Sequence, residues 1–419
     1  MNGLDLLYLA LAGATAPIWA RRARGGWDER FGRVDPARLE RSDGSRPRVL
    51  LHAVSVGEAA SLRTLVPLLA DDLDVVVSAT TDTGLARAEA MYVAGSEPPA
   101  SVVRYPLDFS RSVRRFFDVV RPDLVALVEL ELWPNFIAEC RRRRVPVGVI
   151  GGRLSASSFK GYRKARPLLR RMFASLEFVG AQDDDYAGRF VKMGTPADRV
   201  AVTGSMKWDN AKTTPDAGAA DRLAAELGLD RGRPLVVAGS TGPGEEALLH
   251  RACEGLDCQL LCAPRRPDRF EDAARDLPGA VRRSAGIARA GDRYLLDTLG
   301  ELAAAYALAD VVVVGRTFND MGGSDPTEPA GLGRPVIMGP DVRNFGSMTE
   351  TLESAGGVLR CGREDLRERL GSLLADHAER ARVGAAARES VEAQRGASRR
   401  NAELLRAHVR GHPREQTLR

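Results

Sequence analysis

Glu58 is the residue whose place in the sequence best suits it for chemistry. It follows an apolar run, Val49 to Leu51, that is typical of a buried parallel strand, and a helical pattern begins just after it at Ala59. Ligands of open α/β sheets bind outside the carboxyl ends of the strands, where such a strand-loop-helix turn places its side chains. The sequence therefore predicts a carboxylate that can act on a substrate. The alternative is that Glu58 only complements the positive end of the following helix.

Two further carboxylates follow a second apolar run, Leu124 to Val128. Because strand side chains alternate between faces, we expect Glu129 and Glu131 to share one face while Leu130 points the other way. Two carboxylates on one face at the mouth of a cleft rarely serve packing alone. This strand end is therefore a second predicted acidic site.

A glycine-rich loop in the second half of the chain has the composition of an anion site. The stretch from Gly322 to Ala330 predicts a loop that leads into a helix, with Asp325 as N-cap, Pro326 at the first helical position and Glu328 at the third. Helix capping alone accounts for this pattern. The same geometry also presents free backbone N–H groups, which favour a phosphate.

An alternation of strands and helices must position these residues. Short β-branched strands are predicted at 49–53, 75–79, 102–105, 124–128, 147–150, 178–181, 235–238, 259–263, 311–314 and 335–338. Such alternation predicts parallel sheets covered by helices on both faces. The aperiodic stretch 209–219 is the predicted interdomain linker, and 364–408 is predicted to be helical.

The predicted fold is α/β, with two Rossmann-like domains facing a cleft, which is the GT-B arrangement of glycosyltransferases. The expected divisions are an N-terminal membrane-associating helix at 1–24, Rossmann-like domains at 25–210 and 211–395, and a C-terminal helix or tail at 396–419.

The composition sets broad limits on the class of protein. The chain has 419 residues, 44% hydrophobic and 28% charged, which suits a globular body of two domains. Its net charge of +5 indicates an acidic partner, such as an anionic membrane surface or a phosphorylated ligand. Its five cysteines lack metal-ligand spacing and its five histidines form no HExxH, so we predict free thiols and no metal site. No signature of nucleic-acid binding is present.

The N-terminal stretch from Leu4 to Ala20 is apolar except for Asp5 and Thr15, and arginines follow it. A bilayer-spanning helix needs roughly twenty apolar residues, and a signal peptide carries its positive charge before the apolar segment. We therefore expect a membrane-associating helix, with the following body on the cytoplasmic side. Its removal is expected to leave the chemistry intact. The alternative is a helix packed on its own domain.

Short motifs along nearly the whole chain resemble, in their order and spacing, those of the 3-deoxy-D-manno-octulosonic acid (Kdo) transferases. They lie at 30–32, 52–58 (His-Ala-Val-Ser-Val-Gly-Glu), 80–84, 105–108, 129–135 (Glu-Leu-Glu-Leu-Trp-Pro-Asn), 153–159, 204–209, 238–241, 264–265, 297–302 and 322–339. The resemblance implies transfer of Kdo from CMP-Kdo to a lipid A precursor of the lipid IVA type. It places the protein at the inner membrane and implies an inverting reaction without a cofactor.

The resemblance also implies roles for individual residues. Glu58 is the expected general base for the acceptor hydroxyl, a function worth about a hundredfold to ten-thousandfold in rate. Glu129 and Glu131 belong to the active site, and Glu328 is expected to hydrogen-bond the nucleotide ribose. The other residues expected to bind the substrate or donor are Ser55, Gly57, Lys207, Ser240, Thr241, Arg265, Arg266, Gly300, Glu301, Gly322, Gly323, Ser324 and Asp325. Arginine suits the phosphate and the sugar carboxylate, because its guanidinium makes bidentate anion contacts.

The chain departs from the family pattern at two places. Ser324-Asp325 stands where the family has His-Asn, and Arg265-Arg266 stands where it has Arg-His. Losing an imidazole and gaining a carboxylate weakens anion binding unless Arg266 or Arg316 compensates. A changed donor and a divergent member with reduced activity remain alternatives.

Two other functions compete with Kdo transfer. The first is a GT-B transferase that uses a UDP-sugar on a lipid acceptor, although the donor-loop pattern of such enzymes is absent. The second is a non-catalytic basic protein that binds anionic lipid. A pure anion binder gains nothing from carboxylates in its cleft, so the four glutamates described above argue against it.

Overall fold

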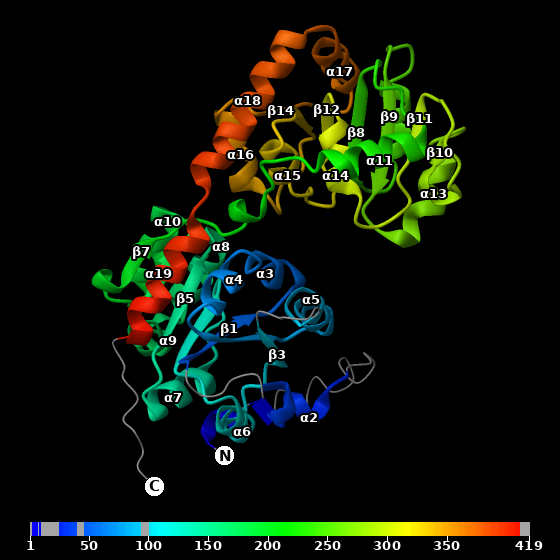
Figure 1. The fold of residues 1–419 in the computed structure, drawn as a ribbon. Helices are drawn as coiled ribbons and strands as arrows, with labels where there is room; N and C mark the ends of the chain where they lie inside the picture. The colour runs from blue at the N-terminus through cyan, green and yellow to red at the C-terminus, as the bar shows by residue number, and fades with distance from the viewer. Residues whose placement is uncertain (1, 7, 10–24, 40–45, 94–99, 411–419) are drawn as a thin grey trace. The chain divides into compact units, whose positions relative to one another are not determined.

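The chain folds into two compact units in the computed structural model, which describes residues 2–6, 8–9, 25–39, 46–93 and 100–410 (Figure 1). Unit 1 consists of Met1–Asn210 together with Arg395–Arg419, and unit 2 consists of Ala211–Gln394. The chain therefore leaves unit 1 after Asn210 and returns to it at Arg395.

Unit 1 is built on a parallel sheet of seven strands in the order β3-β2-β1-β4-β5-β6-β7. The strands are β1 (Arg48–Ala53), β2 (Asp74–Ala79), β3 (Ser101–Arg104), β4 (Leu124–Val128), β5 (Val147–Gly152), β6 (Val179–Ala181) and β7 (Val200–Val202). The central strands are buried on both faces, which is why their sequences are apolar runs and do not alternate with polar residues.

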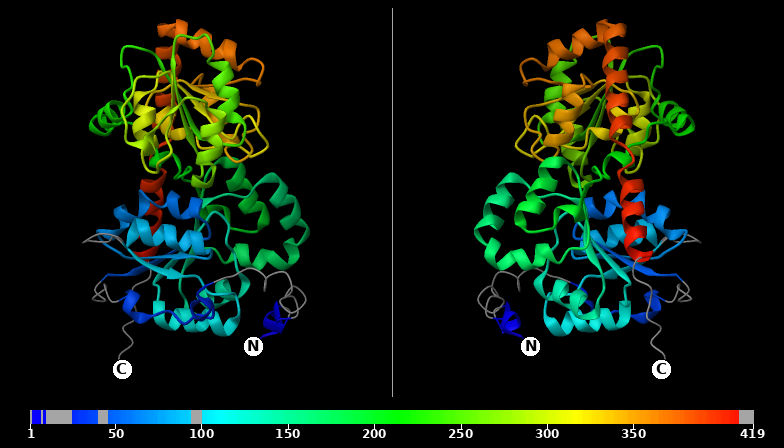
Figure 2. Two further views of the ribbon diagram at one scale, coloured as in Figure 1. Left: turned by 90° about the vertical axis from the view of Figure 1, so that its right-hand side faces the viewer. Right: turned by 90° about the vertical axis from the view of Figure 1, so that its left-hand side faces the viewer.

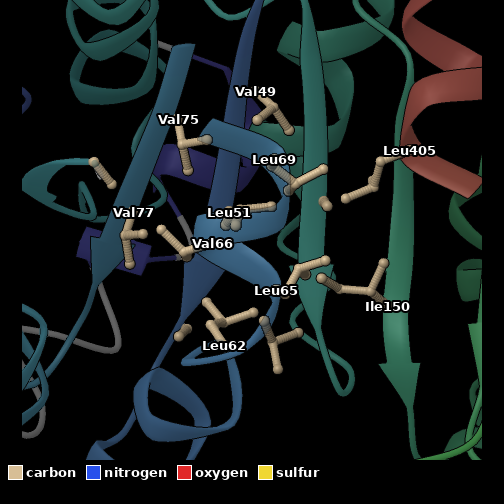
Figure 3. Packing of buried hydrophobic residues seen from close by; sticks show 14 of the residues in the cluster. Val49, Leu51, Leu62, Leu65, Val66, Leu69, Val75, Val77, Ile150 and Leu405 are labelled. Atoms are coloured by element: carbon tan, nitrogen blue, oxygen red, sulfur yellow. The ribbon is translucent and has the colours of Figure 1, made fainter. Parts of the chain in front are cut away.

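Helices cover both faces of this sheet (Figure 2). They are α2 (Trp27–Arg30), α3 (Val56–Ser61), α4 (Leu65–Ala70), α5 (Asp82–Tyr92), α6 (Ser110–Val120), α7 (Pro134–Arg143), α8 (Ala156–Lys164), α9 (Arg166–Ala174), α10 (Asp184–Met193) and α19 (Ala397–Arg410), with 3-10 turns η1 (Pro36–Leu39), η2 (Ala197–Arg199) and η3 (Trp208–Asn210). On one face, Leu51 of β1 packs with Leu65 and Leu69 of α4 and Leu405 of α19 (Figure 3).

Unit 2 repeats the architecture with a parallel sheet in the order β10-β11-β9-β8-β12-β13-β14. Its strands are β8 (Leu235–Thr241), β9 (Gln259–Pro264), β10 (Val281–Arg282), β11 (Arg293–Leu295), β12 (Val311–Val314), β13 (Val336–Met338) and β14 (Val358–Arg360). Its helices are α11 (Ala217–Leu227), α12 (Glu245–Ala252), α13 (Phe270–Asp276), α14 (Leu302–Leu308), α15 (Thr327–Gly331), α16 (Gly346–Ser354), α17 (Leu366–Ala375) and α18 (His377–Gln394), with 3-10 turns η4 (Pro267–Arg269) and η5 (Arg283–Ala285). The structure thus confirms the prediction of two parallel-sheet α/β domains.

The C-terminal helical stretch divides between the units. Helices α17 and α18 belong to unit 2, whereas α19 packs on unit 1. Asp209 caps the start of α19 by accepting hydrogen bonds from the N–H groups of Gly396 (2.6 Å) and Ser398 (2.5 Å). Arg406 pairs with Asp72 at 2.8 Å. The stretch that the sequence set apart as a tail is therefore, as far as Arg410, an integral part of unit 1.

The described part of the N-terminal segment is helical at residues 3–6 and 8–9 and is tied to unit 1 by polar contacts. The carboxylate of Asp5, only 1% exposed, accepts hydrogen bonds from Ser110 N–H at 2.8 Å and Ser110 Oγ at 2.5 Å. Asn135 donates to the same carboxylate at 3.2 Å, and Tyr8 donates to Asp108 at 3.0 Å. The expectation that this segment contributes anchoring alone is wrong, because its polar side chains complete the packing of unit 1.

Other parts of the same segment face solvent. Leu6 and Leu9 are 60% and 49% exposed. Residues 10–24, which contain most of the predicted membrane-associating helix, lie outside the described residues. Within the part of the chain that the structure describes, no helix is both long enough and apolar enough to cross a membrane.

Candidate active site

Glu58 lies in the first turn of α3, and both of its carboxylate oxygens accept local hydrogen bonds. Oε2 accepts the N–H of Val54 at 2.8 Å, and Oε1 accepts the hydroxyl of Ser55 at 2.9 Å. Ser55 is the N-cap, and its Oγ accepts the N–H of Glu58 at 3.4 Å. Ser-Val-Gly-Glu is thus a variant of the capping box, in which the Glu58 carboxylate accepts the N–H of Val54 in place of that of the N-cap residue, and this fixes the carboxylate at the end of β1. The catalytic and the helix-terminal interpretations of Glu58 are therefore compatible, since one geometry serves both.

Glu129 follows β4 with an unusual backbone conformation. The strand ends at Val128, and Glu129 has a φ of 59°, in the left-handed region that non-glycine residues rarely adopt. The expectation that strand alternation places Glu129 and Glu131 on one face is therefore wrong, because the extended backbone stops before either residue. Such strain persists only where the surrounding structure enforces it, and it is concentrated at functional sites.

Lys207 and Trp133 hold the two carboxylates that follow β4. The Nζ of Lys207 lies 3.3 Å from Oε1 of Glu129, and the Nε1–H of Trp133 donates to Oε2 of Glu131 at 3.0 Å. Lys207 was expected to bind the donor or substrate. The structure places it in unit 1, beside Glu129, and its charge lowers the pKa of Glu58.

The three carboxylates form one electrostatic cluster, which we call the unit 1 carboxylates. Burial raises the pKa of Glu131 to about 7, and the negative charges of Glu58 and Glu129 add to the effect. Burial also raises the pKa of Glu58, with a further upward contribution from Glu129 and opposing ones from Val54 N–H, Ser55 and Lys207. The cluster thus holds a carboxyl group that exchanges its proton near neutral pH, as acid-base catalysis requires.

His52, in the same motif as Glu58, does not exchange a proton near neutral pH. Its ring is fully buried, stacks on Tyr105 with 3.6 Å between ring centroids, and lies 3.0 Å from Ser78 Oγ through Nδ1. Burial lowers the pKa of His52 to about 3, so the ring stays neutral and packs within the sheet.

A buried polar network supports the turn that carries Glu131 and Trp133. Asp108 accepts the N–H groups of Asn135 at 3.0 Å and Phe136 at 2.8 Å, which are the first free donors of α7. Burial raises the pKa of Asp108 to about 6. Through Asn135, this network reaches Asp5 of the N-terminal segment.

In unit 2, the loops that follow β8 and β12 bring several of the predicted donor residues together. The Oγ of Ser324, which stands where the family has histidine, lies 3.5 Å from the carbonyl oxygen of Ser240. The N–H of Arg265 donates to the carbonyl of Thr241 at 3.1 Å. Ser240 and Arg316 both have left-handed backbones, with φ of 58° and 62°. Ser240 thus lies at an irregularity near the end of β8, and Arg316 lies in the loop after β12.

The buried hydroxyl of Tyr306 locates the other donor candidates. Burial raises the pKa of Tyr306, and the charges of Glu328 and Asp325 raise it further while that of Arg265 opposes them. Each of these three residues therefore lies within electrostatic range of Tyr306. The predicted cap is supported, because Asp325 accepts the N–H of Thr327 at 2.9 Å and its hydroxyl at 2.7 Å, as an N-cap residue does. Pro326 has a helical backbone conformation, although α15 is bounded at Thr327–Gly331.

Gly322 and Gly323 have backbone conformations that glycine favours. Both have a φ of 81°, and a Cβ at Gly322 would lie 2.4 Å from the side chain of Asn344. The N–H of Gly322 donates to Asp341 at 2.7 Å, and the N–H of Gly323 donates to the carbonyl of Arg316 at 2.7 Å. These two N–H groups are therefore engaged within the protein.

Three predicted donor residues lie in other surroundings. Arg266 is exposed and makes a bidentate contact with Asp268 at 2.9 Å. Glu301 pairs with Arg283 at 3.0 Å and accepts the hydroxyl of Thr298. Gly300 precedes it with a φ of 93°. The described residues contain no group of three His, Cys, Asp or Glu side chains placed to hold a metal ion.

The buried polar residues that support the two sites were not predicted from the sequence. In unit 2, Glu245 and Glu246 are buried beneath the loops, and in unit 1 Asp108 and Asn135 are buried beneath the turn after β4. One feature of the sequence could have indicated Glu245. Gly244-Glu245 follows the central strand of unit 2 at the start of a helix, just as Gly57-Glu58 does in unit 1.

The chain is similar to known proteins over nearly its whole length. A family model described as 3-deoxy-D-manno-octulosonic-acid transferase (kdotransferase) matches residues 25–210. The chain is 36% identical over 434 residues to the 3-deoxy-D-manno-octulosonic acid transferase of Bordetella pertussis, covering 96% of this chain and 99% of that one. It is 30% identical over 424 residues to the enzyme of the same name from Haemophilus influenzae, covering 97% and 96%.

Among solved structures, the UDP-GlcNAc 2-epimerase of Neisseria meningitidis matches with a TM-score of 0.56 and 12% identity, over 87% of this chain and 100% of that one. At this identity, the likeness shows a shared two-domain fold alone.

Proposed function

Because the chain belongs to the 3-deoxy-D-manno-octulosonic acid transferases, which are glycosyltransferases of the GT-B fold, we propose that it transfers Kdo from CMP-Kdo to a lipid A precursor of the lipid IVA type. The observation that carries this proposal is the cluster of unit 1 carboxylates, in which Glu131 has a pKa of about 7. An acceptor hydroxyl is a weak nucleophile, and the carboxylate of Glu58, whose pKa burial and Glu129 raise, can take its proton.

Glu58 is the proposed general base. As the acceptor oxygen bonds to the anomeric carbon of Kdo, the bond from that carbon to the CMP phosphate oxygen breaks, and the hydroxyl proton passes to Glu58. Attack opposite the leaving group inverts the anomeric centre. The capping box supports this role because the hydrogen bonds from Val54 and Ser55 orient the carboxylate before substrate binds.

Unit 2 is the proposed donor-binding unit. Ser240 and Thr241 at the end of β8 come together with Arg265 after β9 and Ser324 in the loop after β12, at the carboxyl ends of the strands. Ligands of open α/β sheets bind at this edge. Glu328 is proposed to hold the ribose, and Arg265 the phosphate or the sugar carboxylate. The reaction needs no cofactor in this proposal.

The decisive experiment incubates the full-length protein with CMP-Kdo and a tetraacylated lipid A precursor and follows the lipid by mass spectrometry. Addition of Kdo to the lipid, with release of CMP, supports the proposal. CMP release without a modified lipid indicates hydrolysis, and modification from a UDP-sugar in place of CMP-Kdo indicates the alternative donor. Calorimetry with CMP and UMP tests donor recognition separately, with CMP expected to bind more tightly.

The inner membrane, with the catalytic body on the cytoplasmic side, is the proposed location. The exposed side chains of Leu6 and Leu9 support it, since apolar side chains of an interfacial helix insert into the acyl boundary of a bilayer. Flotation with anionic lipid vesicles tests the idea. The double variant Leu6→Ser, Leu9→Ser should bind vesicles more weakly than the wild type, whereas the control Ile287→Ser, which changes an exposed residue of unit 2, should bind as the wild type does. Equal binding of all three proteins contradicts this role for the segment.

A further inference from the structure

Two adjacent glutamates at the start of α12 are buried in unit 2. Glu245 is 1% exposed and Glu246 is 0% exposed. Charged side chains are almost never fully buried unless their oxygens are satisfied by partners, because removing a carboxylate from water is costly. The partners of these two carboxylates therefore show what the pair is for.

Glu245 binds three backbone N–H groups from two different loops. Its Oε2 accepts Gly242 N–H at 2.8 Å and Arg316 N–H at 2.6 Å, and its Oε1 accepts Phe318 N–H at 2.9 Å. Gly242 lies in the loop after β8, whereas Arg316 and Phe318 lie in the loop after β12. One side chain thus ties together the loop that follows Ser240 and Thr241 and the loop that leads to Ser324.

The two loops also approach each other so closely that their backbones must keep a fixed arrangement. A Cβ built on Gly315 would lie 2.5 Å from the Cα of Thr241, which only glycine permits. The left-handed φ values of Ser240 and Arg316 lie on the two sides of this approach. A strained backbone of this kind needs strong partners to hold it, and charge-assisted hydrogen bonds to a carboxylate are among the strongest available.

Glu246 completes the support from the same helix turn. Its Oε1 accepts the hydroxyl of Thr241 at 2.6 Å, and its Oε2 pairs with Arg269 at 3.0 Å. The hydroxyl of Thr241, which the sequence assigned to the donor, is therefore already engaged inside unit 2. Thr241 is only 1% exposed and its carbonyl accepts the N–H of Arg265, so this residue supports the site from within unit 2.

We propose that Glu245 is a positioning residue for donor binding, whose carboxylate holds the loops after β8 and β12 in the arrangement that receives the donor phosphate. This inference rests on the proposed function, because it takes those loops as the donor site. Glu245 occupies the N–H groups of Gly242, Arg316 and Phe318, so the phosphate must be met by other groups, among which the guanidinium of Arg316 extends from the same loop. Glu245 acts through the loops and does not touch the donor.

The test compares CMP binding to the full-length wild type and to Glu245→Gln by calorimetry. Glutamine keeps one acceptor oxygen, but its amide N–H groups face the backbone donors, so at least one of the three hydrogen bonds is lost. Losing one such bond should weaken CMP binding about tenfold or more. In a transfer assay, the KM for CMP-Kdo should rise while the KM for the acceptor lipid stays unchanged. A Glu245→Gln protein that binds CMP as tightly as the wild type, or more tightly, overturns the inference.

The matched control is Asp310→Asn. The carboxylate of Asp310 also accepts a backbone N–H, that of Leu235 at 2.9 Å, but it does so at the opposite, amino end of the same strands. Both variants are expected to lower the melting temperature, and only Glu245→Gln should change the Kd for CMP. If both variants weaken CMP binding to the same extent, the effect is general destabilisation and the inference is wrong.

Hydrogen exchange on the unmodified protein provides a second test, which does not depend on any variant folding. Before CMP is added, the amides of Gly242, Arg316 and Phe318 should already exchange slowly, and CMP should change their protection little. Rapid exchange that becomes slow only with CMP overturns the inference, because the ligand would then be ordering the loops. If the amides are protected and the wild type binds no CMP, the donor assignment fails while the fixed geometry of the loops stands.

Discussion

The Nζ of Lys207 lies 3.3 Å from Oε1 of Glu129, a residue whose φ of 59° directs its backbone out of β4. This contact places a positive charge among the three unit 1 carboxylates. The charge lowers the pKa of Glu58 and so opposes the upward effects of burial and of Glu129. Lys207 thus adjusts how readily the proposed base gives up its proton.

Replacing Lys207 with methionine should shift the pH dependence of transfer. Without the positive charge the pKa of Glu58 rises, so a larger fraction of Glu58 is protonated at a given pH. The acid limb of kcat/KM should therefore move to higher pH, by up to about one unit for one nearby charge. The control Lys192→Met removes an exposed lysine of α10 and should leave the profile unchanged. A Lys207→Met profile that coincides with the wild-type one rules out this electrostatic role.

Glu58→Gln should reduce transfer by about two to four powers of ten while leaving CMP binding unchanged, because glutamine cannot accept the proton. The capping box adds a second effect. Loss of one of the two hydrogen bonds to Val54 and Ser55 should cost about 0.5 to 2 kcal/mol of stability. Transfer assays and thermal melts measure the two effects separately.

Ser55→Ala separates capping from catalysis, because it removes the N-cap and retains the Glu58 carboxylate. We expect it to lose about 1 kcal/mol of stability and to keep most of its transfer activity. If Ser55→Ala loses as much activity as Glu58→Gln, helix capping explains both results and the base must be sought at Glu129 or Glu131.

The pKa of about 7 at Glu131 predicts a change in transfer rate near neutral pH. When Glu131 takes up a proton, one negative neighbour of Glu58 disappears, the pKa of Glu58 falls, and Glu58 becomes a weaker base. The rate should therefore decrease as the pH is lowered through about 7. In Glu131→Gln this inflection should be absent. An unaltered inflection in that variant would assign it to another group.

The free energy of unfolding should also depend on whether Glu131 is protonated. Its pKa is raised in the folded state, so the folded protein binds the proton more tightly than the unfolded chain does. The resulting penalty on stability is absent below about pH 4.5, grows as the pH rises to about 7, and is constant above that. Glu131→Gln should consequently raise the melting temperature at pH 8 and have little effect at pH 4. Equal effects at both pH values contradict the shifted pKa.

Asp5→Ala should destabilise unit 1, although Asp5 lies in the segment that the sequence assigned to membrane association. The change leaves the buried Ser110 N–H and the amide of Asn135 without their shared acceptor, at a cost of about 1 to 3 kcal/mol. The exposed Asp28 supplies the control, since Asp28→Ala breaks only a surface pair with Arg33, worth at most about 1 kcal/mol. Urea denaturation measures both variants. Equal midpoints for Asp5→Ala and the wild type would show that the contacts of Asp5 do not contribute to stability.

The strands were predictable from the sequence because their runs of valine, leucine and alanine are buried on both faces, which is a local property of composition. The end of β4 at Val128 was also predicted, but the left-handed backbone of Glu129 was not. Whether the backbone stays extended after Val128 depends on the left-handed turn that the surrounding structure enforces, and the side-chain alternation expected beyond it failed for that reason.

The candidate site was likewise predictable from the sequence only in part. The sequence grouped Glu58 with Glu131 and Ser240 with Ser324, and the structure brings the members of each pair close together. The partners of the Thr241 hydroxyl and the Glu301 carboxylate, which are Glu246 and Arg283, became apparent only in the folded structure. Asp5 shows the difficulty most clearly, since its partner Ser110 lies 105 residues away and the apolar composition around Asp5 gave no sign of it.

The return of the chain to unit 1 at Arg395 has a consequence for its synthesis. Unit 2 is a continuous stretch, so all of it is synthesised before α19 is. Unit 1 at that stage lacks Leu405 and the other α19 side chains that cover one face of its sheet (Figure 3). Although it is translated first, unit 1 therefore becomes complete last, and a nascent chain that stops before Ala397 exposes an apolar surface for chaperones to recognise.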